Sequence, residues 1–340
     1  MTLPGSGTLL FSQIQTEFGG SNPVSLTEYY RGGGLVGSNN TGVPTSGVIS
    51  VTDFYGAAAI FTITLSSNQA DYNLATAASN AGWNGSSPVV LNINSSVFLY
   101  STSTTNAGLI ISNAFSSSGL TINNSGNIIG MGGAGGTPSA TTALRNGSAG
   151  GSAISNASSN VALVINSGAY VAGGGGGGGA GLNGDHSAGG GSGAGSSGTP
   201  GSAGAAVSYT RGDLGTFSAA GCQAGGRSAA TPSGSEDDGP NHATGQSGGR
   251  VLPGQSSALS GFSWQSGSSS AIYYFIAGGA GGAAGSNGGD GQPGGGGGWG
   301  AAGGSGQYDG GGGTTGAAGA AISGTAISTT NNGTIYGATS

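Results

Sequence analysis

The sequence predicts a mainly β and irregular protein with a small helical N-terminal segment, a β-rich neck and a C-terminal bundle of polyglycine-II rods joined by long loops. Three observations predict it. A short helix-capping motif repeats within residues 1–56, β-branched and apolar residues concentrate in 57–129, and glycine returns at every third position after residue 130. We therefore expect three regions: an attachment segment at 1–56, a neck at 57–129 and a glycine-rich domain at 130–340.

The composition excludes several classes of protein. Glycine accounts for 81 of the 340 residues, and the charged residues are five arginines and eleven acids, for a net charge of -6. Glycine supplies no side chain to the core of a conventional enzyme, and five scattered arginines make no phosphate-binding surface for nucleic acid. The aromatic residues, 7% of the chain, argue against simple disorder. The N-terminus lacks a secretory signal and no apolar run could span a membrane, so we expect synthesis in a cytoplasm.

The N-terminal segment contains an internal repeat, in which residues 24–30 (VSLTEYY) match residues 49–55 (ISVTDFY) position by position. In each copy a serine is placed to cap a helix, an acid three residues on closes a capping box, and the flanking apolar residues fit a hydrophobic staple. A third such start at residues 12–15 is ended by two glycines. Helices this short are unstable alone, so we expect docking onto a partner, the alternative being a cap on the same chain. The candidate attachment residues are Leu26, Tyr29, Tyr30, Val51, Phe54 and Tyr55.

The neck is predicted to consist of strands, because residues 60–65 and 89–100 are rich in β-branched and apolar side chains. A second repeat begins here, a strand followed by an asparagine-containing turn and another strand. Asparagine and glycine tolerate the backbone conformations of such turns. The turns begin at Asn94, Asn124, Asn166 and Asn331, and the second and third copies run directly into glycine tracts.

The glycine tracts carry a strict period. Ten glycines fall at every third residue from Gly279 to Gly306, and shorter runs repeat the pattern. Three residues per turn is the period of the polyproline-II helix, which has no internal hydrogen bonds. Collagen shares this period but needs many prolines, and a flexible linker needs no register. We therefore expect glycine rods that hydrogen-bond to neighbouring rods, with the long run folding back into several short ones.

This combination resembles the tail-fibre tip adhesins of T-even-type bacteriophages, in which rod-forming glycine tracts alternate with polar, non-repetitive loops. The N-terminal repeat also resembles virion structural proteins of tailed phages. The resemblance implies a receptor-binding virion protein at the tip of a tail fibre, made in the host cytoplasm. It further implies that the N-terminal part attaches to the fibre or baseplate, while the loops bind an outer-membrane protein or a glycan on the host surface.

Receptor contacts are expected in the loops between the tracts, at 137–149, 182–188, 205–270 and 307–309, because connections carry the informative side chains. Rigid aromatic residues among serine, glycine and asparagine form a binding-loop composition, although a small satellite core would use the same aromatics. The candidates are Tyr209, Arg211, Asp213, Phe217, Arg227, Asp237, His242, Trp264 and Tyr308.

No cofactor, metal or catalytic site is predicted. The acidic residues 236–238 lack the loop spacing of a calcium site, and no nucleophile–base or phosphate-loop signature is present. Two alternatives to an adhesin stay open: a purely structural fibre or decoration protein, and an ice- or surface-binding glycine-rich protein. A homotrimer and a single copy on a trimeric fibre are both compatible with the sequence.

Overall fold

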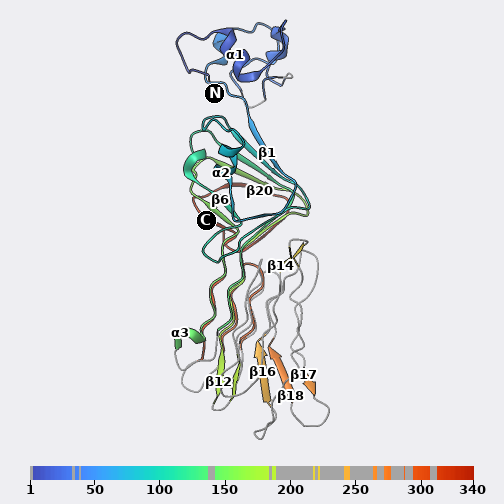
Figure 1. Cartoon of the computed structure of the whole chain (residues 1–340), viewed down its shortest axis with the longest axis vertical. Coiled ribbons are helices and arrows are strands. Elements are labelled where there is room, and N and C mark those ends of the chain that lie inside the picture. The colour runs from blue at the N-terminus through green and yellow to red at the C-terminus, as the bar shows by residue number, and fades with distance from the viewer. Residues whose placement is uncertain are drawn as a thin grey trace.

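The computed structural model describes residues 3–32, 35–37, 40–136, 142–183, 186–188, 217–218, 221–222, 241–245, 263–265, 272–276, 287, 294–306 and 312–340. Three parts follow one another along the long axis of the molecule: an N-terminal unit (residues 3–59), a stack of parallel β-coils, and the glycine-rich segments (Figure 1). The described part is mainly β, as expected, with few and short helices. None of the described helices is long and apolar enough to cross a membrane.

The N-terminal unit contains one α-helix and two 3-10 helices, α1 (Phe11–Phe18), η1 (Leu26–Tyr29) and η2 (Val51–Phe54). Helix α1 ends at Gly19, whose φ of 80° is a conformation that glycine adopts at little cost. The helices surround one small core, in which the rings of Tyr29 and Phe54 meet edge-on with centroids 6.2 Å apart. This packing supplies the stability that helices of four to eight residues lack by themselves.

The middle of the molecule is a three-sided parallel β-helix, because each of the first four coils of the chain adds one strand to each of three parallel sheets, and a last coil adds one strand to two of them. The first sheet contains β1 (Phe61–Leu65), β4 (Val89–Ile93), β7 (Leu120–Asn124), β10 (Val161–Ile165) and β20 (Ser328–Asn331). The second contains β2 (Gln69–Ala70), β5 (Phe98–Tyr100), β8 (Asn127–Ile129), β11 (Tyr170–Ala172) and β21 (Thr334–Tyr336). The third contains β3 (Tyr72–Asn73), β6 (Leu109–Ile111), β9 (Ile154–Asn156) and β19 (Ile322–Gly324).

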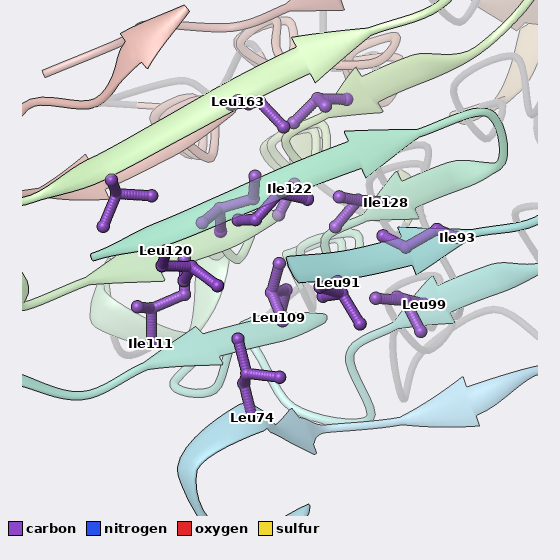
Figure 2. Packing of buried hydrophobic residues seen from close by; sticks show 14 of the residues in the cluster. Leu74, Leu91, Ile93, Leu99, Leu109, Ile111, Leu120, Ile122, Ile128 and Leu163 are labelled. Carbon is purple, nitrogen blue, oxygen red and sulfur yellow. The ribbon is translucent and has the colours of Figure 1, made fainter. Parts of the chain in front are cut away.

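The β-helix is filled by aliphatic side chains that point inward from all three sheets. Leu91, Ile122 and Leu163 lie at matched positions on adjacent strands of the first sheet and are fully buried. Together with residues such as Leu109 and Ile128 from the other two sheets, they form one continuous cluster (Figure 2). Stacking of like residues from coil to coil therefore makes the core of this region.

The predicted asparagine turns form the corners between the first and second sheets. In one of them the Asn124 side chain accepts a hydrogen bond from the Gly126 amide at 3.1 Å. A Cβ on Gly126 would lie 2.5 Å from the Val97 carbonyl oxygen, so the corner requires glycine. Two further short helices, α2 (Leu74–Asn80) and η3 (Asn113–Phe115), follow strands of the third sheet.

The glycine segments are insertions into the coils of the β-helix. In the third coil the chain leaves β8 as residues 130–136 and returns as 147–151 before β9. In the fourth coil it leaves β11 as residues 173–180 and returns as 312–319 before β19. Strands and glycine segments are thus interleaved along the sequence, and the β-helix includes strands beyond residue 129. The division of the chain into three domains stays a prediction.

Segment 173–180 lies at the centre of this region, and each successive residue pairs with a different neighbour. The amides of Gly174 and Gly177 donate to the carbonyls of Gly151 and Ser148, both at 2.9 Å. Gly175, which follows Gly174, pairs with segment 130–136 instead, since its carbonyl accepts a hydrogen bond from the Gly133 amide at 2.8 Å. The remaining position of each triplet pairs with segment 294–306. The carbonyls of Gly173, Gly176 and Gly179 accept hydrogen bonds from the amides of Gly300, Gly297 and Gly294, respectively. The hydrogen-bond period is therefore three, equal to the glycine period.

The segments approach one another too closely for any side chain at these positions. A Cβ built on Gly133, Gly177 or Gly316 would lie 1.9–2.0 Å from a backbone carbonyl oxygen of the adjacent segment. In segment 312–319 the residues between the buried glycines face outward, as at Ala317 and Ala318, which are exposed while Gly316 is buried. Every residue of the central segment 173–180 is buried. Glycine at every third position is thus what allows the backbones to hydrogen-bond to each other.

The long glycine run folds back within its described part. The chain turns at Trp299 and Gly300, where Gly300 has a φ of 59°, and residues 301–306 return beside 294–298. Trp299 is fully buried against Tyr170, with ring centroids 6.3 Å apart, in a small cluster beside the second sheet. This tryptophan therefore packs between the β-helix and the glycine segments.

The remaining elements belong to the connections. The expected loop 137–149 includes helix α3 (Thr142–Arg145), and its end at Gly147 and Ser148 is part of a paired glycine segment. The other elements are short strands: β12 (Gly181–Asn183), β13 (His186–Ala188), β14 (Phe217–Ser218), β15 (Gly221–Cys222), β16 (Asn241–Gly245), β17 (Ser263–Gln265) and β18 (Ile272–Ile276).

Candidate attachment surface and receptor-binding loops

Three short helical starts organise the N-terminal unit. We call residues 10–15 copy 1, residues 25–30 copy 2 and residues 50–55 copy 3. In copies 2 and 3 the predicted capping boxes are present: the Ser25 hydroxyl accepts from the Thr27 amide at 3.3 Å, and Asp53 accepts from the Ser50 amide at 2.7 Å. Copy 1 begins two residues earlier than predicted, since its N-cap is Leu10 rather than Ser12.

Copy 1 lacks a serine cap, and its glutamine replaces the acid. The Gln13 side-chain oxygen accepts a hydrogen bond from the Leu10 amide at 2.8 Å, which is the bond that Glu28 and Asp53 accept in the other two copies. All three copies therefore have the same local geometry although their sequences differ at the first position.

Burial follows the same order in each copy. The fifth residue, Ile14, Tyr29 or Phe54, is at most 1% exposed and forms part of the shared core. By contrast, an apolar residue at the start of each copy faces solvent: Leu10 is 57% exposed, Leu26 51% and Val51 36%. The unit thus displays one large apolar side chain from each copy around a well-packed interior.

Tyr29 connects copy 2 to the end of helix α1. Its hydroxyl donates a hydrogen bond of 2.6 Å to the Gly19 carbonyl. Burial raises the pKa of Tyr29 above its ordinary value, and the adjacent Glu28 carboxylate adds to the shift. The phenol therefore stays protonated and keeps its donor over the neutral range.

The six predicted attachment residues fall into three classes in this structure. Leu26 and Val51 are exposed, Tyr30 and Tyr55 are half-buried, and Tyr29 and Phe54 lie in the core. Leu10, together with the 91% exposed Val48, is an apolar surface residue that the sequence reasoning did not select. The sequence feature that could have identified Leu10 is the third helical start, which we expected at Ser12.

Most of the predicted receptor contacts lie outside the described residues, namely Tyr209, Arg211, Asp213, Arg227, Asp237 and Tyr308. Phe217, His242 and Trp264 are placed only by their backbone, on β14, β16 and β17. His242 and Trp264 are both in register with Tyr273 of the intervening strand β18. Their role in receptor binding stays a prediction.

Within the part of the chain that the structure describes, no group of three or more histidine, cysteine, aspartate or glutamate side chains is placed to hold a metal ion. The acidic residues 236–238 are not among those residues.

A family model described as "Phage tail fibre adhesin Gp38" matches residues 60–241, which is more than half of the chain. The chain belongs to this family. The protein is therefore a bacteriophage tail fibre adhesin, a binding and structural component of the virion rather than an enzyme. The matched range covers much of the β-helix and begins directly after the N-terminal unit.

A solved structure supports the same fold over nearly the whole length. The chain is similar to one in the crystal structure of the gp37–gp38 adhesin tip complex of the bacteriophage S16 long tail fibre, with a TM-score of 0.50 and 22% identity. The alignment covers 98% of each chain, including the N-terminal unit that the family model leaves out. A comparison with curated protein sequences gave no match.

Proposed function

We propose that this adhesin sits at the tip of a phage tail fibre, attaches to the fibre through residues 3–59 and binds the host surface through the loops between its glycine segments. The exposed apolar residues Leu10, Leu26 and Val51 support the attachment role. The similar phage S16 protein is also found in complex with a second fibre protein. The N-terminal unit and the glycine segments lie at opposite ends of the β-helix, so the two roles are spatially separate (Figure 1).

We infer that the glycine segments form a polyglycine-II bundle. The support is the hydrogen-bond period of three, in which a single segment pairs with neighbours on several sides. A β-strand pairs with two neighbours only, whereas a threefold rod can pair in three directions. Such a bundle presents its loops on a support whose backbone is buried and hydrogen-bonded.

The loop of residues 205–270 is the main candidate for receptor contact. It is the longest interruption of the glycine period, and it contains the aromatic residues expected of a binding loop. An outer-membrane protein and a surface glycan are the two receptor classes that fit this composition.

The receptor assignment is tested with the full chain and whole host cells. Labelled protein is measured for binding to susceptible cells, and then compared with a variant in which residues 205–270 are scrambled at constant composition. Loss of cell binding is expected. A matched control scrambles the two exposed pairs Thr314-Thr315 and Ala317-Ala318 on the outer face of a glycine segment. This control variant should retain cell binding. Equal binding by all three proteins would favour a purely structural fibre component.

A further inference from the structure

Residues 320–340, which we call the closing strap, complete the β-helix after the long glycine-rich insertion. The strap contains β19, β20 and β21, and each of them is the end strand of its sheet. Within the described part of the chain, each therefore pairs with one other strand only, namely β9, β10 and β11. In a stack of coils each unit is stabilised by its neighbours, so an end unit is held less firmly than an inner one.

The side chains of the strap add few buried apolar contacts. Ile322 is buried, but all four residues of β20 are exposed and those of β21 are half-buried. Thr329 continues the core position of the fully buried Leu163 and is itself exposed. Ile327 and Ile335 are only partly buried against the core. The strap is therefore held largely by backbone hydrogen bonds, which is typical of regions that open locally.

The two ends of the strap are bonded to each other. The Ile322 amide donates to the Ala338 carbonyl at 3.1 Å, and the Ser340 amide donates to the Ile322 carbonyl at 3.2 Å. Residues 338–340 thus lie beside β19. Because detachment of β20 and β21 would also remove these bonds, we expect the strap to open as one piece.

Two glycine segments are joined to the strap directly. Segment 312–319 runs into it without interruption. Segment 173–180 is bonded to it by the Gly173 amide, which donates to the Tyr336 carbonyl at 2.9 Å. Glycine has no side chain with which to fix a register, so the register of segment 312–319 depends on the strand that follows it.

A third segment, 294–306, meets the strap at its turn. A Cβ on Gly300 would lie 2.3 Å from the Gly337 nitrogen, so the two backbones are in close contact. Tyr336 packs against the small cluster that contains the buried Trp299. Detachment of the strap would therefore remove a neighbour from all three segments.

We propose that the closing strap is a conformational latch, whose docking on β9, β10 and β11 holds the glycine segments 294–306 and 312–319 in place. When the strap opens, both segments open with it, while the inner coils of the β-helix and the N-terminal unit stay folded. The latch requires neither a fibre partner nor a receptor, so it goes beyond the proposed function.

The coupling is measured by amide hydrogen exchange of the full chain at increasing, low concentrations of denaturant. In the parent protein, the strap and segments 294–306 and 312–319 should share one opening free energy, below that of β4 and β7. Separate opening of the glycine segments, at a different free energy from the strap, would overturn the proposal. A single opening that also includes β4 and β7 would overturn it too, because the strap would then be no separate latch.

The substitutions Ile335→Ser and Ile327→Ser test the cause. Each removes a partly buried apolar contact of the strap without altering a glycine segment. Protection should fall by about 10-fold or more in the strap and by an equal factor in segments 294–306 and 312–319. Protection of β4 and β7 should be unchanged, which verifies that the variants are folded.

Thr330→Val is the matched control, because Thr330 is exposed on β20 and valine keeps its size and branching. This variant should leave protection of the strap and of both glycine segments unchanged. If Ile335→Ser and Ile327→Ser lower protection in the strap alone, the strap does not hold the glycine segments and the proposal is wrong.

Discussion

The close approach of the glycine segments makes Gly316→Ala a severe change. A Cβ on Gly316 would lie 2.0 Å from the Ser148 carbonyl oxygen, and real Cβ atoms essentially never come within 3.0 Å of such an atom. The segments must therefore separate by about 1 Å. The bonds that join the two segments run from the Gly147 amide to the Thr314 carbonyl, now 2.9 Å, and from the Gly150 amide to the Ala317 carbonyl, now 3.0 Å, and both would exceed hydrogen-bonding distance.

The cost follows from these contacts. Two lost backbone hydrogen bonds contribute about 1 kcal/mol each, and the strain of an added methyl group in a packed region contributes about 1–3 kcal/mol. We expect a local destabilisation of about 3–5 kcal/mol. Amide hydrogen exchange measures local opening directly, and protection of segments 147–151 and 312–319 should fall by roughly 10²- to 10⁴-fold.

The control for this substitution lies two residues away. Ala318→Ser also adds one heavy atom, but Ala318 faces solvent, so exchange in both segments should be unchanged. If Gly316→Ala keeps the parent's protection, or if Ala318→Ser loses as much, close backbone packing is not what requires glycine here.

Three further predictions concern single side chains. Trp299→Ala empties a fully buried site between the β-helix and the glycine segments and should cost about 3–5 kcal/mol, seen as a lower unfolding temperature. Asn156→Ala removes buried side-chain bonds, including one of 2.8 Å to the Thr325 carbonyl, and should cost about 2–4 kcal/mol in denaturant unfolding. Burial and Glu28 raise the pKa of Tyr29, so its contribution should be complete below about pH 10 and lost as pH rises through the higher folded pKa. Alkaline hydrogen exchange in the N-terminal unit should show this loss, and Tyr29→Phe should remove the pH dependence at a cost of about 1 kcal/mol at neutral pH.

Local features of the fold were predictable because they depend on neighbouring residues. The serine-capped starts of η1 and η2, the strands at 61–65 and 89–93 and the asparagine corners were all expected from short patterns. The start of α1 was misplaced by two residues because an apolar residue, Leu10, occupies the capping position that was assigned to Ser12.

The arrangement of the strands was not predictable in the same way. Ile154 pairs with Ile322 across most of the glycine-rich sequence, and no local pattern specifies so distant a partner. The hydrogen bond from the Tyr55 hydroxyl to the Gly7 carbonyl could not be predicted for the same reason, since 48 residues of sequence separate the two.

The register of the glycine segments is set by the β-helix. Ile129 is in register with Ala172 at the end of strands β8 and β11. The parallel alignment of these strands continues into the glycine segments, where the Gly130 amide donates to the Ala172 carbonyl and, three residues on, the Gly133 amide donates to the Gly175 carbonyl. The returning segments keep one alignment in the same way. The Gly150 amide donates to the Ala317 carbonyl and, three residues on, the Ala153 amide donates to the Ala320 carbonyl. A glycine rod has no side chains with which to choose among registers three residues apart. The strands make that choice through side-chain packing, which explains why segments 130–136, 147–151, 173–180 and 312–319 each begin or end near a strand of the β-helix.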